Sequence, residues 1–182
     1  MTQEPELSPT PELTGRLKGI VAAALRILES EGLAAVTMRR VAAGVGIQAP
    51  SLYKHVKDKD VILGLLQRHA MVEFGRAVGA AGPSGRQVAA AYRQWALANP
   101  SLYELAARRP VRRDIVGETE AFAAAPLVRA VGGDPNKARA FLGVAHGLVD
   151  LELNAHFPPG ANIEAAWNVA VDALVGSTAR PP

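Results

Sequence analysis

The chain has no cysteine among its 182 residues. Disulfides, cysteine-bound zinc, iron–sulfur clusters and thiol nucleophiles are therefore excluded. It also lacks any apolar run near the roughly 20 residues that cross a bilayer. Its start, MTQEPELSPTPE, is acidic and proline-rich, unlike the basic-then-apolar start of a secretory signal. We therefore expect a soluble, cytoplasmic protein with no membrane partner.

Strand signals are also missing, because no run alternates apolar and polar residues over strand length. Helix signals recur instead, and nearly half of the residues are hydrophobic, enough to bury a core. Pro126 is expected to kink or split the helix in which it lies. The sequence predicts an all-α fold of about nine helices: residues 13–31, two short helices within 37–56, then 59–81, 85–98, 101–109, 114–131, 135–157 and a last helix from 162.

Residues 37–59, TMRRVAAGVGIQAPSLYKHVKDK, are the most informative segment. Thr37 can cap a helix, and Gly44 and Gly46 permit the left-handed backbone that ends it and turns the chain. Pro50 then stands where a helix can begin without losing a hydrogen bond. The second helix is only about six residues long, so packing against its neighbours must hold it. This pattern predicts a helix-turn-helix.

Positive charge is concentrated around this motif. Between residues 13 and 59, eight Lys and Arg accompany three Asp and Glu, a net +5, whereas the whole chain carries +3. Local positive charge favours DNA, because neutralising phosphates releases condensed counterions. A solvated basic face is the alternative for a stretch of this kind. Beside a helix-turn-helix, DNA binding is the interpretation that we favour.

Residues 13–60 resemble the DNA-binding domain of the tetracycline-repressor (TetR) family of bacterial transcription regulators. The resemblance lies in LESEGL at 28–33, then VTMRRVAAGVGI, then SLYKHVKDKD. Val56 stands where the family commonly has an aromatic residue, and its apolar side chain can still point inward. In the C-terminal part, AHGLVDLELNAHF at 145–157 resembles a segment of some TetR ligand domains, of the WHG type.

The resemblance implies a division of the chain into three parts. These are a disordered tail at 1–12, a helix-turn-helix DNA-binding domain at 13–60, and a helical ligand-binding and dimerisation domain at 61–178. It also implies a homodimer built on the last two long helices, whose alanines allow close approach. The expected partners are double-stranded DNA with a palindromic operator and a small-molecule effector. The alternative is that the last two helices only complete the core of the monomer.

The resemblance assigns DNA-contact roles to individual residues. Thr37 donates to a phosphate, and Arg39 makes a bidentate contact to guanine. The start of the recognition helix meets base edges, with the residues Gln48, Ala49, Pro50 and Ser51. Phosphate contacts are expected from Tyr53, Lys54, His55 and Lys59. Tyr53 could instead be half-buried packing. The neighbouring residues expected in the core are Val41, Val45, Ile47 and Leu52.

The C-terminal part is expected to sense a ligand. Aromatic residues on its middle helices, with one histidine as a polar contact, could line a largely apolar pocket. They are Tyr92, Trp95, Tyr103, Phe122 and His146. Each aromatic residue could equally be an ordinary core residue. Ligand binding to one conformation would shift the spacing of the two DNA-binding heads.

An enzymatic function was weighed against this reading. His146 precedes Asp150 by four residues and Glu152 precedes His156 by four, but such pairs on a helix are usually salt bridges. The histidines lack metal-ligand spacing, and no phosphate-binding loop follows a strand. We therefore expect no enzyme, no metal and no cofactor. The prediction is a dimeric repressor released by a ligand; the alternative is a helical ligand- or protein-binding module whose helix-turn-helix does not read DNA.

Overall fold

The computed structural model describes residue 13 and residues 15–175. These residues form ten α-helices, one 3₁₀ helix and no strand, which confirms the all-α prediction. The helices are α1 (Gly15–Glu31), η1 (Leu33–Ala35), α2 (Met38–Val45), α3 (Ala49–Leu52), α4 (Lys59–Gly79), α5 (Gly85–Ala98), α6 (Pro100–Arg108), α7 (Arg113–Val116), α8 (Thr119–Ala130), α9 (Pro135–Leu153) and α10 (Ile163–Val175). The predicted tail at 1–12 and the last residues of the predicted second domain, from 176, lie outside the described residues.

The chain divides into two compact units, and the division falls inside α4. The first unit comprises residues 1–72 and 101–122, and the second comprises 73–100 and 123–182. A packed unit is therefore assembled from segments distant in sequence. The domain boundary expected at residue 60 does not coincide with the division between these units, and it stays a prediction.

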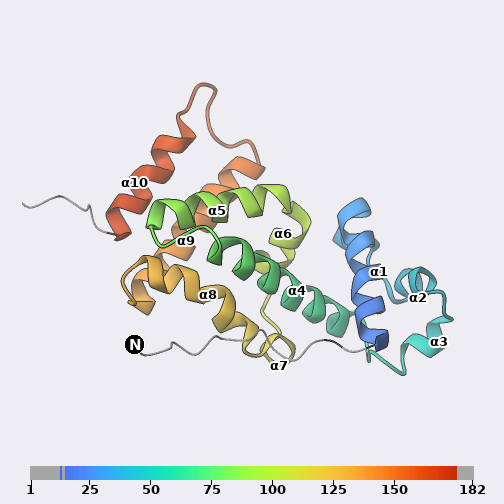
Figure 1. Ribbon diagram of the computed structural model, residues 1–182. Coiled ribbons are helices and arrows are strands. Elements are labelled where there is room, and N and C mark those ends of the chain that lie inside the picture. The colour runs from blue at the N-terminus through green and yellow to red at the C-terminus, as the bar shows by residue number, and fades with distance from the viewer. Residues whose placement is uncertain (1–12, 14, 176–182) are drawn as a thin grey trace, which may run out of the picture. The chain divides into compact units, whose positions relative to one another are not determined.

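The N-terminal end of the first unit holds the helix-turn-helix. Helix α1 packs on α2, and α2 packs on α3 (Figure 1, blue to teal). Ile20 and Leu28 of α1 and Val41 of α2 are fully buried. Leu52 is the buried residue of α3, which has only one turn and therefore depends on this anchor. Val56 is 2% exposed, so the expected inward position of this residue is confirmed.

The two glycines of the turn have different roles. Gly46 follows α2 in the left-handed conformation, with φ 74°, and its N–H bonds to Ala42 and Ala43 carbonyls. Gly44 instead lies inside α2, where a Cβ atom would come 3.1 Å from the Cβ of Ala23 in α1. Only Gly46 therefore makes the turn, while Gly44 permits the close approach of α1 and α2.

A buried amide ties α4 to the chain after α6. The side chain of Gln67 is buried at 2% exposure. Its Nε2 donates to the carbonyls of Leu105 at 3.3 Å and Pro110 at 3.1 Å, and its Oε1 accepts from the Arg112 amide at 3.2 Å. These three bonds fix the turn between α6 and α7 against α4, because they satisfy backbone groups that no helix can satisfy.

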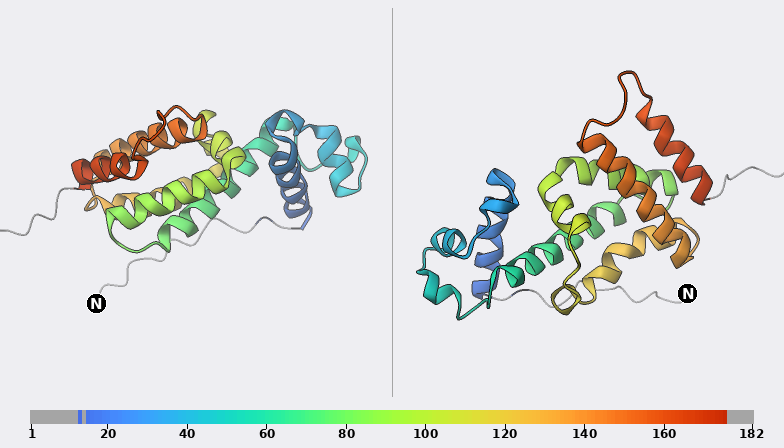
Figure 2. Two further views of the ribbon diagram at one scale, coloured as in Figure 1. Left: turned by 90° about the horizontal axis from the view of Figure 1, so that it is seen from above. Right: turned by 180° about the vertical axis from the view of Figure 1, so that it is seen from behind.

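The second unit is built around α5, α9 and α10, which pack on one another in pairs (Figure 2). Ser84 and Gln87 form a reciprocal capping box at the start of α5. Asp134 caps α9, and Asn162 accepts from the Ala165 amide at the start of α10 at 2.9 Å. The last two helices therefore begin as the sequence predicted.

Three helix limits differ from the sequence prediction. The segment 114–131 divides at Gly117, whose φ is 55°, and α8 continues through Pro126, so a split at Pro126 is wrong, while a kink there stays a prediction. Helix α9 ends at Leu153 rather than near residue 157, because Asn154 caps it with its side chain on the Asp150 carbonyl at 2.8 Å. The recognition helix is shorter than six residues, and turns continue it to His55.

Candidate nucleic-acid interface and ligand site

The residues expected to touch DNA lie around the two helices of the helix-turn-helix. Thr37 accepts from the Arg40 amide at 3.3 Å and so caps α2 as predicted. Seven of the ten expected contact residues are exposed: Thr37, Arg39, Gln48, Pro50, Tyr53, Lys54 and His55. Partly exposed positions are held by Ala49, Ser51 and Lys59. The surface is therefore available, and the individual contacts stay predictions.

Tyr53 lies at the surface of the recognition helix. It is 55% exposed, while Leu52 and Val56 on either side are buried. Its DNA contact and the half-buried packing role both stay predictions. Val45 and Ile47 were expected in the core but are only partly buried, because they flank the exposed turn.

The basic residues of the head differ in their partners. Both guanidinium nitrogens of Arg40 bond to Glu31 at the end of α1, Nη1 at 2.6 Å. This pairing raises the pKa of Arg40 and lowers the pKa of Glu31. Arg39 makes no side-chain hydrogen bond or ion pair within residues 15–175. Lys59 reaches the Leu33 carbonyl at 3.5 Å. Arg39 is therefore the better candidate to read a base, while Arg40 joins α1 to α2.

Aromatic side chains gather in the second unit. The ring of Phe74 meets those of Tyr92 and Trp95 edge-on, with centroids 5.1 and 5.3 Å apart. Tyr92 also lies 6.3 Å from Trp167. Its hydroxyl is 2.9 Å from Nδ1 of His146, and burial lowers the pKa of this histidine. The structure thus brings together three of the five residues expected at the ligand site: Tyr92, Trp95 and His146.

The other two expected ligand residues belong to the first unit. Tyr103 is buried at 4% exposure in α6, and Phe122 is partly buried in α8. Sequence reasoning missed Phe74 and Trp167. Trp167 could have been found, because it lies on the apolar stripe of the last helix.

A second feature that the sequence did not predict is an ion pair at this cluster. Arg93 of α5 donates through Nε and Nη2 to both carboxylate oxygens of Glu152 in α9, at 2.7 to 2.9 Å. The indole Nε1 of Trp167 donates to the same carboxylate at 2.8 Å. Glu152 therefore pairs across helices, not with His156 one turn further along its own helix.

The structure gives no support to a metal site or a membrane span. Within the part of the chain that it describes, no three His, Asp or Glu side chains are placed to hold a metal ion. None of the described helices is long and apolar enough to cross a membrane.

Comparison with known families addresses both parts of the chain. Residues 20–65 match the family model of TetR-type bacterial regulatory proteins. Residues 86–174 match the model of a tetracycline-repressor-like C-terminal domain. The chain belongs to the TetR family. Both domains expected of a TetR-family chain are therefore present, in the expected order.

Two curated relatives are similar to only a short part of this TetR-family chain. It is 42% identical over 64 residues to the HTH-type transcriptional repressor DrrR1 of Streptomyces coeruleorubidus, which is 35% of this chain and 23% of DrrR1. It is 38% identical over 50 residues to the class E tetracycline repressor of Escherichia coli, 28% of this chain and 24% of the repressor. Each match thus spans less than a quarter of the relative's length.

Solved structures resemble the whole chain. The multidrug-binding protein EbrR in complex with imidazole is 25% identical, with a TM-score of 0.68 over 88% of this chain and 96% of EbrR. Its ethidium complex is 27% identical, with a TM-score of 0.67 over 85% and 95%. A Rhodococcus protein of unknown function, 20% identical with a TM-score of 0.71 over 92% of this chain and 97% of its own, shows the fold alone.

Proposed function

We propose that this chain is a dimeric DNA-binding transcription regulator, a repressor released by a small molecule bound in its second unit. The observation that carries the proposal is the exposed basic helix-turn-helix within the segment that matches the TetR DNA-binding model. DrrR1 and the class E tetracycline repressor, which are similar to 35% and 28% of this chain, are both repressors.

DNA binding follows from the charge and exposure of the head. The short α3 can enter a major groove while the exposed Lys54 and His55 meet phosphates. Arg39 makes no side-chain hydrogen bond or ion pair among the described residues, and its guanidinium is a fork of the kind that binds guanine O6 and N7. Sequence would then be read by few residues, so one head alone would bind weakly.

A homodimer would supply the second head. Exposed apolar side chains on α9 and α10 support such a dimer. Val169 is 70% exposed, and Val144 and Leu151 are 40% and 38% exposed. A Cβ atom added at Gly143 or Gly147 of α9 would meet nothing within 4 Å. Exposed apolar groups beside open glycines suit close helix approach by a second copy. Two heads would then address half-sites one helical turn or a multiple apart.

Effector binding is supported by the aromatic cluster of the second unit. Large rings from α4, α5 and α10 lie close together, with His146 as a polar group. EbrR, similar over nearly its whole length, binds imidazole, proflavin and ethidium. A small molecule preferred by one conformation would shift the population of the DNA-binding form.

Selection of duplex DNA by the purified full chain, followed by titration at two salt concentrations, tests the function. We expect a near-palindromic site, with affinity falling by about 0.9 log units per log of salt for each phosphate neutralised. Arg39→Ala should cost roughly 1–3 kcal/mol on the selected site and relax its sequence preference, whereas Lys54→Ala should weaken all sequences alike.

Lys137→Ala is the matched control, because Lys137 is an exposed lysine on α9, outside the head. It should leave DNA affinity unchanged. Weak, sequence-blind binding by the wild type would instead support the alternative, a helical binding module whose helix-turn-helix does not read DNA.

A further inference from the structure

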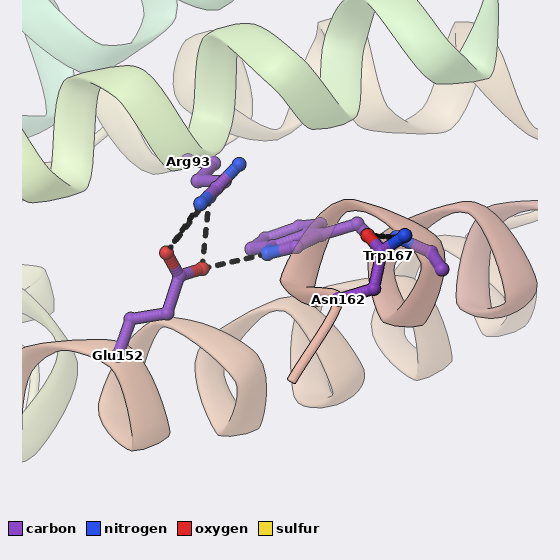
Figure 3. A network of polar contacts seen from close by, with 5 residues as sticks. Arg93, Glu152, Asn162 and Trp167 are labelled. Atoms are coloured by element: carbon purple, nitrogen blue, oxygen red, sulfur yellow. Dashed lines mark hydrogen bonds and ion pairs between the residues drawn. The ribbon is translucent and has the colours of Figure 1, made fainter. Parts of the chain in front are cut away.

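The two partners of the Arg93–Glu152 ion pair are buried to different extents. The side chain of Glu152 is 7% exposed, whereas that of Arg93 is 33% exposed. Figure 3 shows the carboxylate between the guanidinium of Arg93 and the indole N–H of Trp167. A carboxylate held this deeply needs a cation beside it, because an unpaired buried charge is strongly destabilising.

The asymmetry decides which partner can leave. Arg93 sits on a long side chain that already reaches solvent, so rotation about its own bonds would return the guanidinium to water. Glu152 has no such route, since it is short and faces α5 and α10 from α9. The exchangeable component of the pair is therefore the cation, and the fixed component is the carboxylate.

The surroundings of the carboxylate suit an organic cation rather than a hydrated ion. Trp167 donates to the carboxylate, and its ring lies next to the ring of Tyr92. The ring of Tyr92 in turn contacts that of Phe74. Aromatic faces attract cations and cover apolar groups attached to them. Burial lowers the pKa of the nearby His146, which favours the neutral imidazole over a competing cation.

We propose that Glu152 anchors an effector site for aryl cations with a planar amidinium or guanidinium head, and that Arg93 occupies the place of this head in the ligand-free protein. The head is specified by geometry: Arg93 presents two N–H groups to two oxygens, and an amidinium carries the same fork. Release of Arg93 would break the ion pair that joins α5 to α9, so ligand binding would change a contact between these two helices. The effector role rests on the proposed regulator function; binding at Glu152 does not.

Calorimetric titration of the full chain with benzamidine tests the site directly. Arg93→Ala should bind benzamidine at least tenfold more tightly than the wild type, because no internal guanidinium has to be displaced. The double variant Arg93→Ala/Glu152→Gln should lose this binding. Benzamide, the neutral analogue of the same shape, should bind neither the wild type nor the Arg93→Ala variant. Equal binding by the single and double variants, or no binding by either, would overturn the site.

Arg93→Ala also leaves a buried carboxylate unpaired, which destabilises the variant, and this instability is itself a readout. Millimolar benzamidine should raise its melting temperature by several degrees, since a ligand stabilises the state that it binds. Benzamide should not. If Arg93→Ala does not fold, Arg93→Lys keeps the charge without the fork and should still bind benzamidine more tightly than the wild type. A Lys variant indistinguishable from the wild type would count against the proposal.

A separate titration with DNA distinguishes failure of the site from failure of the function. Wild-type protein bound to its selected DNA should be released as benzamidine is added. Benzamidine binding without DNA release would refute the effector role while leaving the cation site in place. Loss of all sequence-specific DNA binding would refute the proposed function, and the calorimetric comparison would still decide the site.

Discussion

Replacing Gln67 by Leu should destabilise the first unit in a localised way. Leucine fills a similar volume, so the change removes hydrogen bonds with little loss of packing. It would leave two carbonyls and the Arg112 amide without their partner, in a region where Gln67 is 2% exposed. Each buried group left unsatisfied costs about 1–3 kcal/mol.

Not all of this cost should appear. The Leu105 bond is buried, but the Pro110 and Arg112 bonds are only partly buried, so water can satisfy these two groups in part. We therefore expect a loss of about 2–4 kcal/mol in the free energy of unfolding. For a chain of this size, such a loss lowers the melting temperature by about 5–15 °C.

Urea denaturation followed by circular dichroism gives the total effect, and hydrogen exchange shows its location. Exchange should accelerate most in residues 105–113, where the freed backbone groups lie. Gln94→Leu is the matched control, because Gln94 is exposed on α5, and it should change stability by less than about 0.5 kcal/mol. If Gln67→Leu matched this control in both stability and exchange, the three bonds would contribute nothing, and the turn after α6 would be held by other contacts.

Three further predictions concern single positions. Gly46→Ala should cost about 1–2 kcal/mol, measured by urea denaturation, because its φ of 74° is unfavourable for alanine; an unchanged midpoint would mean that the turn adopts another conformation. Burial lowers the pKa of His146, so the unfolded state binds more protons below pH 6.5 and stability should fall as the pH decreases from there. His146→Gln should flatten this dependence between pH 7.5 and 5.5, and an identical slope would assign the effect to other groups. Arg86→Ala removes the bonds of Arg86 Nη2 to both Asp172 oxygens at 2.7 and 2.8 Å, yet both side chains are about half exposed, so thermal denaturation should reveal a loss below about 1 kcal/mol. A larger loss would show that this ion pair is needed to hold α10 on α5.

The helix-turn-helix could be predicted from sequence because its signals are local. Thr37 caps the helix that follows it, and Gly46 adopts the left-handed conformation that only a glycine adopts easily. The absence of strand patterns likewise predicted the all-α fold. The same local reasoning was wrong in allowing a split at Pro126, because the helix divides at Gly117 and α8 continues through the proline.

The ligand site could be predicted only in part, for a different reason. Tyr92 and His146 are 54 residues apart and meet only because α5 packs on α9. Glu152 looked like the partner of a histidine on its own helix, but packing placed the guanidinium of Arg93 and the indole of Trp167 against it. Local sequence patterns do not predict which helices pack against each other.

The sequence alone therefore determined what depends on neighbours in the chain: the helices, their caps, the turn of the DNA-binding head and its positive charge. Only the tertiary structure decided which charged side chains pair and which are buried, because these depend on segments distant in the sequence. It separated Arg40, paired with Glu31, from Arg39, which has no side-chain partner in the part of the chain that the structure describes. It also buried the Glu152 carboxylate beside Arg93, whose side chain still reaches solvent. The physical reason is that hydrogen bonds within a turn are set by adjacent residues, whereas desolvation and pairing of charges exist only once helices have packed.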